Sequence, residues 1–258
     1  MADSRILIYD GSFNGFLTTV FMAFELNMPI TDIQKNSTTE NGLFVQTKTI
    51  FTNLDKAKRV WNGVQKKSNT AIKNIYFAFQ SESKGIELIL YKYIRNMYDQ
   101  QEVFPEALSN PIELKIELIA KNVSREKQRV EAFARFQNTQ DHIKFINLEP
   151  NFDILPLISK HYRSKYNEQE WLIYDIKRNY GIFYDLEKVE IISLDLQEFY
   201  SNNNYSKGLL SELDYNSLEV FDNYFKSTSV KALINKKLLH QKVSEPKHEK
   251  TQLKREAV

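Results

Sequence analysis

The order of strand-like and helix-like segments restricts the possible folds of this chain more than any other feature of its sequence. Apolar or alternating runs suited to β-strands cover residues 5–9, 43–51, 142–148, 170–175, 180–184 and 189–194. Apolar residues at helical spacing predict helices over 16–26, 53–64, 69–80, 84–98, 111–136, 151–166 and 209–225. The polar residues 31–41 predict a loop. Because strands and helices do not alternate regularly, we predict an α+β fold, mostly helical with a small mixed or antiparallel sheet, rather than a doubly wound sheet.

Basic residues are concentrated toward the C-terminal end. Residues 226–258 contain nine Lys and Arg against three Glu, a net charge of about +6. The whole chain has a formal net charge of +2, so residues 1–225 carry about −4. We expect a single main domain over 1–225 and a lysine-rich, disordered tail over 226–258 that binds polyanions non-specifically. Any specific nucleic-acid surface on the main domain must then be a local patch.

The absence of cysteine excludes several kinds of site. Disulfides, cysteine nucleophiles, thiolate zinc sites and iron–sulfur clusters all need a residue that this chain lacks. The four histidines do not have the spacing of metal ligands, so we predict no metal site and no cofactor. The longest apolar run, near residues 86–91, is far shorter than the roughly 20 residues that cross a bilayer, and no apolar signal segment precedes Asp10. We therefore expect a soluble, cytoplasmic protein without membrane contact.

An arginine-rich segment over residues 124–136 is the first candidate binding site. On a helix, Arg125 and Arg129 lie one turn apart and form a stripe, while Arg135 projects from the other flank. A guanidinium group grips a phosphate through two hydrogen bonds or stacks on a base. The residues expected to face the core are Val123, Val130, Phe133 and Ala134. The alternative is an ordinary amphipathic helix in which Glu126 and Glu131 neutralise the arginines.

The second candidate is the segment Tyr9–Phe16, where the first strand turns into a helix. It contains Asp10 and two glycines, and the free N–H groups of a helix start can hold an anion. Asp10 is a candidate base or metal ligand. The spacing matches neither a P-loop nor a dinucleotide-binding motif. On this segment alone we favour the structural alternative, in which the glycines form turns and Asp10 or Ser12 caps the helix.

The third candidate spans residues 160–184, where basic residues and aromatic rings are interleaved. This pattern is typical of a surface that follows a nucleic-acid backbone and stacks on bases. The candidate phosphate contacts are Arg163, Lys165, Lys177 and Arg178. The candidate stacking residues, provided that they are exposed, are Trp171, Tyr174 and Tyr180. The alternative for Trp171 and for Phe183 is a place in the core of a sheet.

His161 and Asp175 are the only pair in this third segment that resembles a general acid and base. Together with Asp10 they are the candidate catalytic residues. A single histidine on a helix is more often a structural residue held by hydrogen bonds, so the structural alternative is favoured for His161.

Taken together, three segments resemble a known family. They are Tyr9–Leu17, then Ser124–Glu126 with Arg129 and Ala132–Phe136, and then Pro156–Tyr162 with Trp171–Gly181. In order and spacing they are similar to the bacterial "probable DNA metabolism protein" family, a domain of unknown function, over roughly residues 5–225. The chain departs from that family's pattern at Gln128, where the family has His, and at Ser124, where it has Gly. The departure at Gln128 favours binding over catalysis.

The resemblance implies a partner and a process. Members of that family are encoded beside a radical S-adenosylmethionine (SAM) protein of DNA modification or repair, and in some relatives the domain is fused to a uracil-DNA-glycosylase-like domain. Three functions stay open: a nucleic-acid-binding accessory protein that acts on DNA with the radical SAM partner; a glycosylase- or nuclease-like hydrolase using Asp10, His161 or Asp175; and a protein–protein scaffold that does not contact DNA.

Overall fold

The structure, a computed structural model, describes residues 5–27, 29–35, 46–99, 111–139 and 141–193 together with Lys226 and Ser229. The chain divides into two compact units. The first comprises Met1–Ala132 and Asn151–Ile154, and the second comprises Phe133–Pro150 and Leu155–Val258. Within the described part of the chain, no helix is long and apolar enough to cross a membrane.

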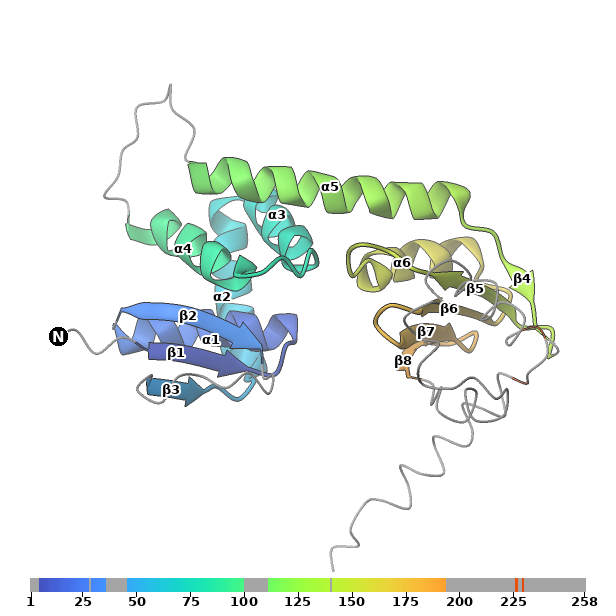
Figure 1. The fold of residues 1–258 in the computed structure, drawn as a ribbon, viewed down its shortest axis with the longest axis horizontal. Coiled ribbons are helices and arrows are strands. Elements are labelled where there is room, and N and C mark those ends of the chain that lie inside the picture. The colour runs from blue at the N-terminus through green and yellow to red at the C-terminus, as the bar shows by residue number, and fades with distance from the viewer. Residues whose placement is uncertain are drawn as a thin grey trace, which may run out of the picture. The chain divides into compact units, whose positions relative to one another are not determined.

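The first unit is a small parallel sheet covered by helices (Figure 1). Its strands are ordered β2-β1-β3, with the apolar β1 (Arg5–Tyr9) between β2 (Ile30–Lys35) and β3 (Gln46–Thr49). The helices are α1 (Phe13–Leu26), α2 (Leu54–Lys67), α3 (Asn69–Phe79), α4 (Ile86–Asp99) and α5 (Pro111–Phe133). Leu7, Phe16 and Ile75 are among the fully buried side chains of its core.

Side-chain caps fix where three of these helices begin. Ser12 accepts a hydrogen bond from the backbone N–H of Gly15 at 2.9 Å, Asn53 from that of Lys56 at 3.0 Å, and Ser68 from that of Ala71 at 3.1 Å. Such caps satisfy N–H groups that have no partner inside the helix and are each worth about 1 kcal/mol. The predicted helix start at Asn53 is therefore confirmed.

The second unit contains a five-stranded mixed sheet in the order β4-β5-β6-β7-β8. Its elements are β4 (Gln137–Asn138), β5 (Lys144–Leu148), α6 (Leu155–Lys165), β6 (Trp171–Asp175), β7 (Tyr180–Tyr184) and β8 (Val189–Ile192). Only the β5–β6 pair is parallel, and α6 connects these two strands. A cluster of rings packs α6 on the sheet: Tyr162 lies 6.2 Å from Trp171, and Trp171 lies 5.5 Å from Tyr184, between ring centroids.

The predicted α+β class, with small sheets, is confirmed. Among the individual elements, the loop predicted over 31–41 is wrong for residues 31–35, because β2 pairs in parallel with β1. This strand lies at the edge of the sheet and fully buries only Ile33, so its sequence is largely polar. The helix predicted over 209–225 lies outside the described residues, as does the tail apart from Lys226 and Ser229.

Two helix boundaries differ from the prediction. The helix predicted over 151–166 begins at Leu155, which leaves Pro156 in the first turn, where a missing N–H costs nothing. The helix predicted over 111–136 ends at Phe133. The expectation that Phe133 faces the core is wrong, since it is 75% exposed, although Val123 is fully buried as predicted.

Candidate functional site

Two of the predicted phosphate-binding arginines line one pocket on α5. Arg125 and Arg129 are both exposed, and a hollow of about 230 Å³ lies beside them. The other residues that line it are Asn122, Glu126, Asn151 and Phe152. All six belong to the first unit. The pocket thus combines two guanidinium groups with two side-chain amides, and both kinds of group donate hydrogen bonds to anions.

Glu126 is the one buried residue that lines this pocket. Its carboxylate accepts hydrogen bonds from the backbone N–H groups of Asn151 at 2.9 Å and Phe152 at 3.2 Å. The guanidinium group of Arg129 lies 3.2 Å from the same carboxylate. Glu126 therefore holds residues 151–152 against α5. The side-chain amide of Asn151, at 3.3 Å, is a fourth donor to the same carboxylate. These four donors compensate the negative charge of Glu126.

The pocket has a surplus positive charge. Arg125 has no hydrogen-bond or ion-pair partner among the described residues. Arg129 is paired with Glu126, yet its side chain is 65% exposed and can still contact a ligand. Glu131, the other predicted neutralising group, pairs with Lys127 at 2.7 Å instead of with an arginine. Of the two arginines, one is therefore held by a carboxylate and the other is available.

The remaining predicted phosphate contacts belong to the second unit, and four of them are exposed. Arg135 donates to the carbonyl oxygen of Ala134 at 3.1 Å, and Arg163 donates to that of Glu187 at 2.9 Å. The ammonium group of Lys165 lies 5.4 Å from the centre of the Tyr166 ring. Lys177 is exposed in the turn between β6 and β7. These side chains are accessible to a polyanion.

The fifth, Arg178, is engaged in a buried ion pair with Asp175. The guanidinium group of Arg178 lies 2.8 Å from the Asp175 carboxylate, and these side chains are 12% and 0% exposed. Arg178 also donates to the carbonyl oxygen of Pro150 at 3.1 Å. Burial raises the pKa of Asp175, and the hydrogen bonds and charge of Arg178 only partly oppose that rise. Asp175 thus has no exposed surface, and the pair links the end of β6 to the turn before β7.

The aromatic residues of the same hairpin are mostly core residues. Trp171 and Tyr174 have no exposed surface, so the condition for stacking on a base is not met by either. Both lie on β6, whose residues are all buried because the strand is central in the sheet. Phe183, which is only 6% exposed, follows the core alternative. Tyr180, at the start of β7, is half-buried and is the only stacking candidate with accessible surface.

Asp10 lies at the carboxyl end of β1, where α1 begins. Its carboxylate accepts hydrogen bonds from the backbone N–H and hydroxyl of Ser12 at 2.9 and 2.7 Å, and from the Thr52 hydroxyl at 2.6 Å. Partial burial acts to raise the pKa of Asp10, but these hydrogen bonds outweigh it and lower the pKa below its usual value. The arrangement matches the structural alternative, in which Asp10 and Ser12 organise the helix start and tie it to the segment after β3.

The three candidate catalytic residues are not brought together within either unit. Asp10 belongs to the first unit, whereas His161 and Asp175 belong to the second. His161 is half-buried on α6 beside the Tyr162 ring, 5.4 Å between centroids, and the Asp175 carboxylate is engaged by Arg178. Among the described residues there is also no group of three or more His, Asp or Glu that could hold a metal ion.

Glu126 is buried, whereas the sequence analysis predicts a surface charge at this position, and the sequence contains a signal for the burial. The apolar stripe of α5 runs through Ile116, Ala120 and Val123, and Glu126 is the next position of that stripe. A carboxylate at such a position predicts a buried acceptor with fixed donors. Thr52 had no local signal, because its partner Asp10 is 42 residues away in sequence.

Most of the candidate site residues lie in a region of the chain that matches a known family. The family profile described as a domain of unknown function, DUF4130, matches residues 84–251, more than half of the chain. The matched region includes Arg125, Arg129 and the whole of the second sheet, and it extends past residue 225 into the expected tail. No curated protein matches the chain. By this match the chain belongs to the DUF4130 family.

Proposed function

We propose that this chain is a nucleic-acid-binding accessory protein whose main phosphate contact is the α5 pocket. One observation supports the proposal above all others: Arg125 and Arg129 line the same hollow, and Arg125 has no partner among the described residues. An unpaired guanidinium beside a second one is suited to bidentate binding of a phosphate.

The size and chemistry of the pocket favour a phosphate over a larger ligand. Its volume of about 230 Å³ lies below the roughly 300–1,000 Å³ that is usual for pockets that enclose drug-sized molecules. The negative charge of Glu126 is balanced by its own donors, so it repels an anion less than an unpaired carboxylate would. Accessible cations in the second unit, namely Arg135, Arg163, Lys165 and Lys177, provide further non-specific contacts.

The proposed nucleic acid is DNA, and the proposed process is DNA repair or modification in the cytoplasm with a radical SAM enzyme as partner. This part of the proposal rests on the family resemblance of the three segments given above. The lack of cysteine agrees with an accessory role, because a radical SAM cluster needs thiolate ligands that this chain does not supply.

The test is DNA binding by the full chain as a function of salt concentration. We expect the Arg125→Ala/Arg129→Ala variant to bind a DNA duplex more weakly and to reduce the log–log salt slope by about 0.9, the value for one lost phosphate contact. The matched control is Lys115→Ala/Lys121→Ala, which removes the same charge from exposed positions of the same helix. We expect it to change the slope much less.

Equal slopes for the two double variants would reject the pocket as the contact. Failure of the unaltered chain to bind DNA, combined with co-purification of a radical SAM enzyme, would favour the scaffold instead. Release of a base or a cut strand from uracil-containing or alkylated oligonucleotides would favour the hydrolase.

A further inference from the structure

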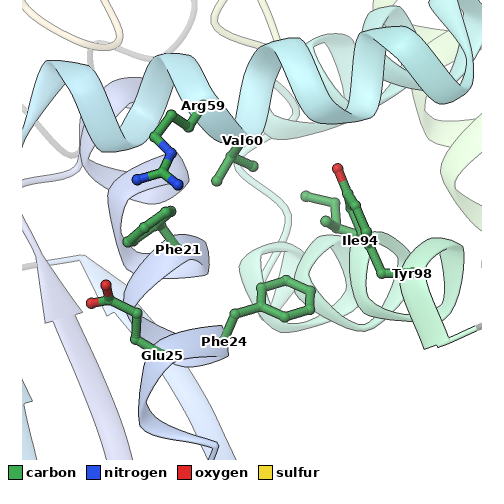
Figure 2. A pocket seen from close by; sticks show the side chains of 7 residues that line it. All are labelled: Phe21, Phe24, Glu25, Arg59, Val60, Ile94 and Tyr98. Carbon is green, nitrogen blue, oxygen red and sulfur yellow. The ribbon is translucent and has the colours of Figure 1, made fainter.

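The first unit contains a second pocket, larger and more apolar than the one on α5, between α1, α2 and α4 (Figure 2). Its volume is about 410 Å³, within the range of roughly 300–1,000 Å³ found for small-molecule sites. The residues that line it are Phe21, Phe24 and Glu25 of α1, Arg59 and Val60 of α2, and Ile94 and Tyr98 of α4. Neither Arg125 nor Arg129 is among them.

The pocket has an apolar base and aromatic walls. Ile94 is fully buried and Val60 is 9% exposed, whereas the walls Phe24 and Tyr98 are 37% and 40% exposed. The rings of Phe24 and Tyr98 meet edge to face, with centroids 5.7 Å apart. Exposed ring faces and edges of this kind favour a planar aromatic guest in stacked or edge-to-face contact.

Gly63 of α2 leaves room for the side chain of Tyr98. A Cβ atom at this position would lie 2.3 Å from the Tyr98 hydroxyl oxygen. A glycine in a helix interior is less favourable than alanine by about 1 kcal/mol, so the open wall of the pocket is maintained at a cost to α2. Tyr98 is further held by the ammonium group of Lys67, 4.5 Å from the centre of its ring.

The charges at the rim leave one cation available. Glu25 pairs with Lys56 at 3.2 Å, which neutralises that carboxylate. The guanidinium carbon of Arg59 lies 5.1 Å from the centre of the Phe21 ring, and Figure 2 shows the group directed over that ring. Arg59 has no ion-pair or hydrogen-bond partner among the described residues. The rim therefore carries one uncompensated positive charge beside an apolar, ring-lined cavity.

We propose that this pocket binds a small aromatic anion, with its ring packed against the exposed parts of the Phe24 and Tyr98 rings and its carboxylate or sulfonate on Arg59. The apolar lining accepts the body of the ligand, and the uncompensated guanidinium selects its charge. Arg59 keeps its contact with the Phe21 ring while it donates in its own plane, so the ligand needs no rearrangement of the rim. This site is independent of the nucleic-acid contact proposed for α5.

The probe is 2-naphthoate, and its neutral partner of equal shape is 2-naphthamide. Titration of the full chain, followed by calorimetry, should give saturable one-to-one binding of 2-naphthoate and binding of 2-naphthamide that is about ten-fold weaker or more, because the charge-assisted hydrogen bonds are lost. Decanoate, which carries the same charge on a flexible chain, should bind more weakly than 2-naphthoate.

Two variants locate the site. Arg59→Gln should weaken 2-naphthoate about ten-fold and leave 2-naphthamide unchanged, whereas the control Lys58→Gln, at the exposed neighbouring position, should change neither. Phe24→Ala should weaken both ligands. Circular dichroism and denaturant unfolding identify any variant that has lost its fold. Absence of 2-naphthoate binding at millimolar concentration, equal binding of the two naphthyl ligands, tighter binding of decanoate, or an Arg59→Gln variant that binds like Lys58→Gln would each overturn the proposal.

Discussion

At the scale of single residues, burial decides which charged groups of this protein are structural and which are available. Asp175 and Arg178 form a pair with almost no exposed surface, whereas Arg125 and Arg59 are exposed and have no ion partner among the described residues. Removal of one member of a buried pair leaves an uncompensated charge, which costs much more free energy than the loss of a surface contact.

We therefore expect Arg178→Ala to lower the free energy of unfolding by about 3–5 kcal/mol, because Asp175 stays buried without its partner. Urea unfolding followed by circular dichroism measures this change. Lys177→Ala, at the exposed neighbouring position, should stay within about 0.5 kcal/mol of the unaltered chain. A similar effect of the two substitutions would mean that the ion pair does not stabilise the hairpin.

Thr52→Val tests the hydrogen bonds that lower the pKa of Asp10. Loss of the 2.6 Å hydrogen bond should raise the pKa of Asp10, as measured by an NMR titration of its carboxyl carbon. A carboxyl group with a lowered folded-state pKa contributes stability above its unfolded pKa of about 3.9, and this contribution is lost as pH falls through the folded pKa. The variant should therefore lose more stability at pH 7 than at pH 2. Thr49→Val, an exposed control on β3, should leave the pKa of Asp10 unchanged.

At the scale of elements, α5 both buries an apolar stripe and forms the arginine pocket. Its apolar stripe ends at Val123, and from Glu126 onward polar contacts take over. The Glu126 carboxylate holds residues 151–152, and Asp153 in turn donates its backbone N–H to the Gln80 carbonyl oxygen at 3.0 Å after α3. The segment that forms one side of the arginine pocket is thus fixed to two helices of the first unit.

Glu126→Ala should lower the free energy of unfolding by about 1–3 kcal/mol, because two backbone N–H groups lose their acceptor. The midpoint of urea unfolding reports the change. Glu117→Ala removes an exposed carboxylate from the same helix and should have an effect within about 0.5 kcal/mol. If Glu126→Ala proves as mild as Glu117→Ala, residues 151–152 do not depend on this carboxylate.

At the scale of the whole molecule, the proposed DNA affinity has a local part in the α5 pocket and a diffuse part in the lysine-rich C-terminal segment. Within that segment, the hydroxyl of Ser229 donates to Asp141 at 2.6 Å, so a truncation should spare this residue. Residues 231–258 contain eight Lys and Arg against three Glu, a net charge of about +5.

Deletion of residues 231–258 should weaken DNA binding to a similar degree for every duplex sequence, with the largest loss at low salt. Fluorescence anisotropy with several duplexes at two salt concentrations measures this effect. The loss should add to that of Arg125→Ala/Arg129→Ala, since separate contacts contribute independently. A deletion that changes affinity for one sequence only would contradict a non-specific role.

The sequence by itself determined the elements whose local signals are strong. The apolar run at residues 5–9, the cap at Asn53 and the helical spacing over 69–80 each predict their element, because these signals are local in the sequence. It also placed Arg125 and Arg129 on one stripe, since their spacing of four residues fixes their relation on any helix.

Only the tertiary structure decided which of these residues are accessible and what they contact. Burial of Trp171, Tyr174 and Asp175 depends on β6 lying between β5 and β7, which the composition of the strand does not reveal. The Asn151 partner of Glu126 and the Thr52 partner of Asp10 are 25 and 42 residues away in sequence, beyond the reach of any local pattern. Whether a side chain is exposed or paired depends on contacts between segments that are distant in the sequence. These contacts left Arg59 and Arg125 exposed and buried the pair of Asp175 and Arg178.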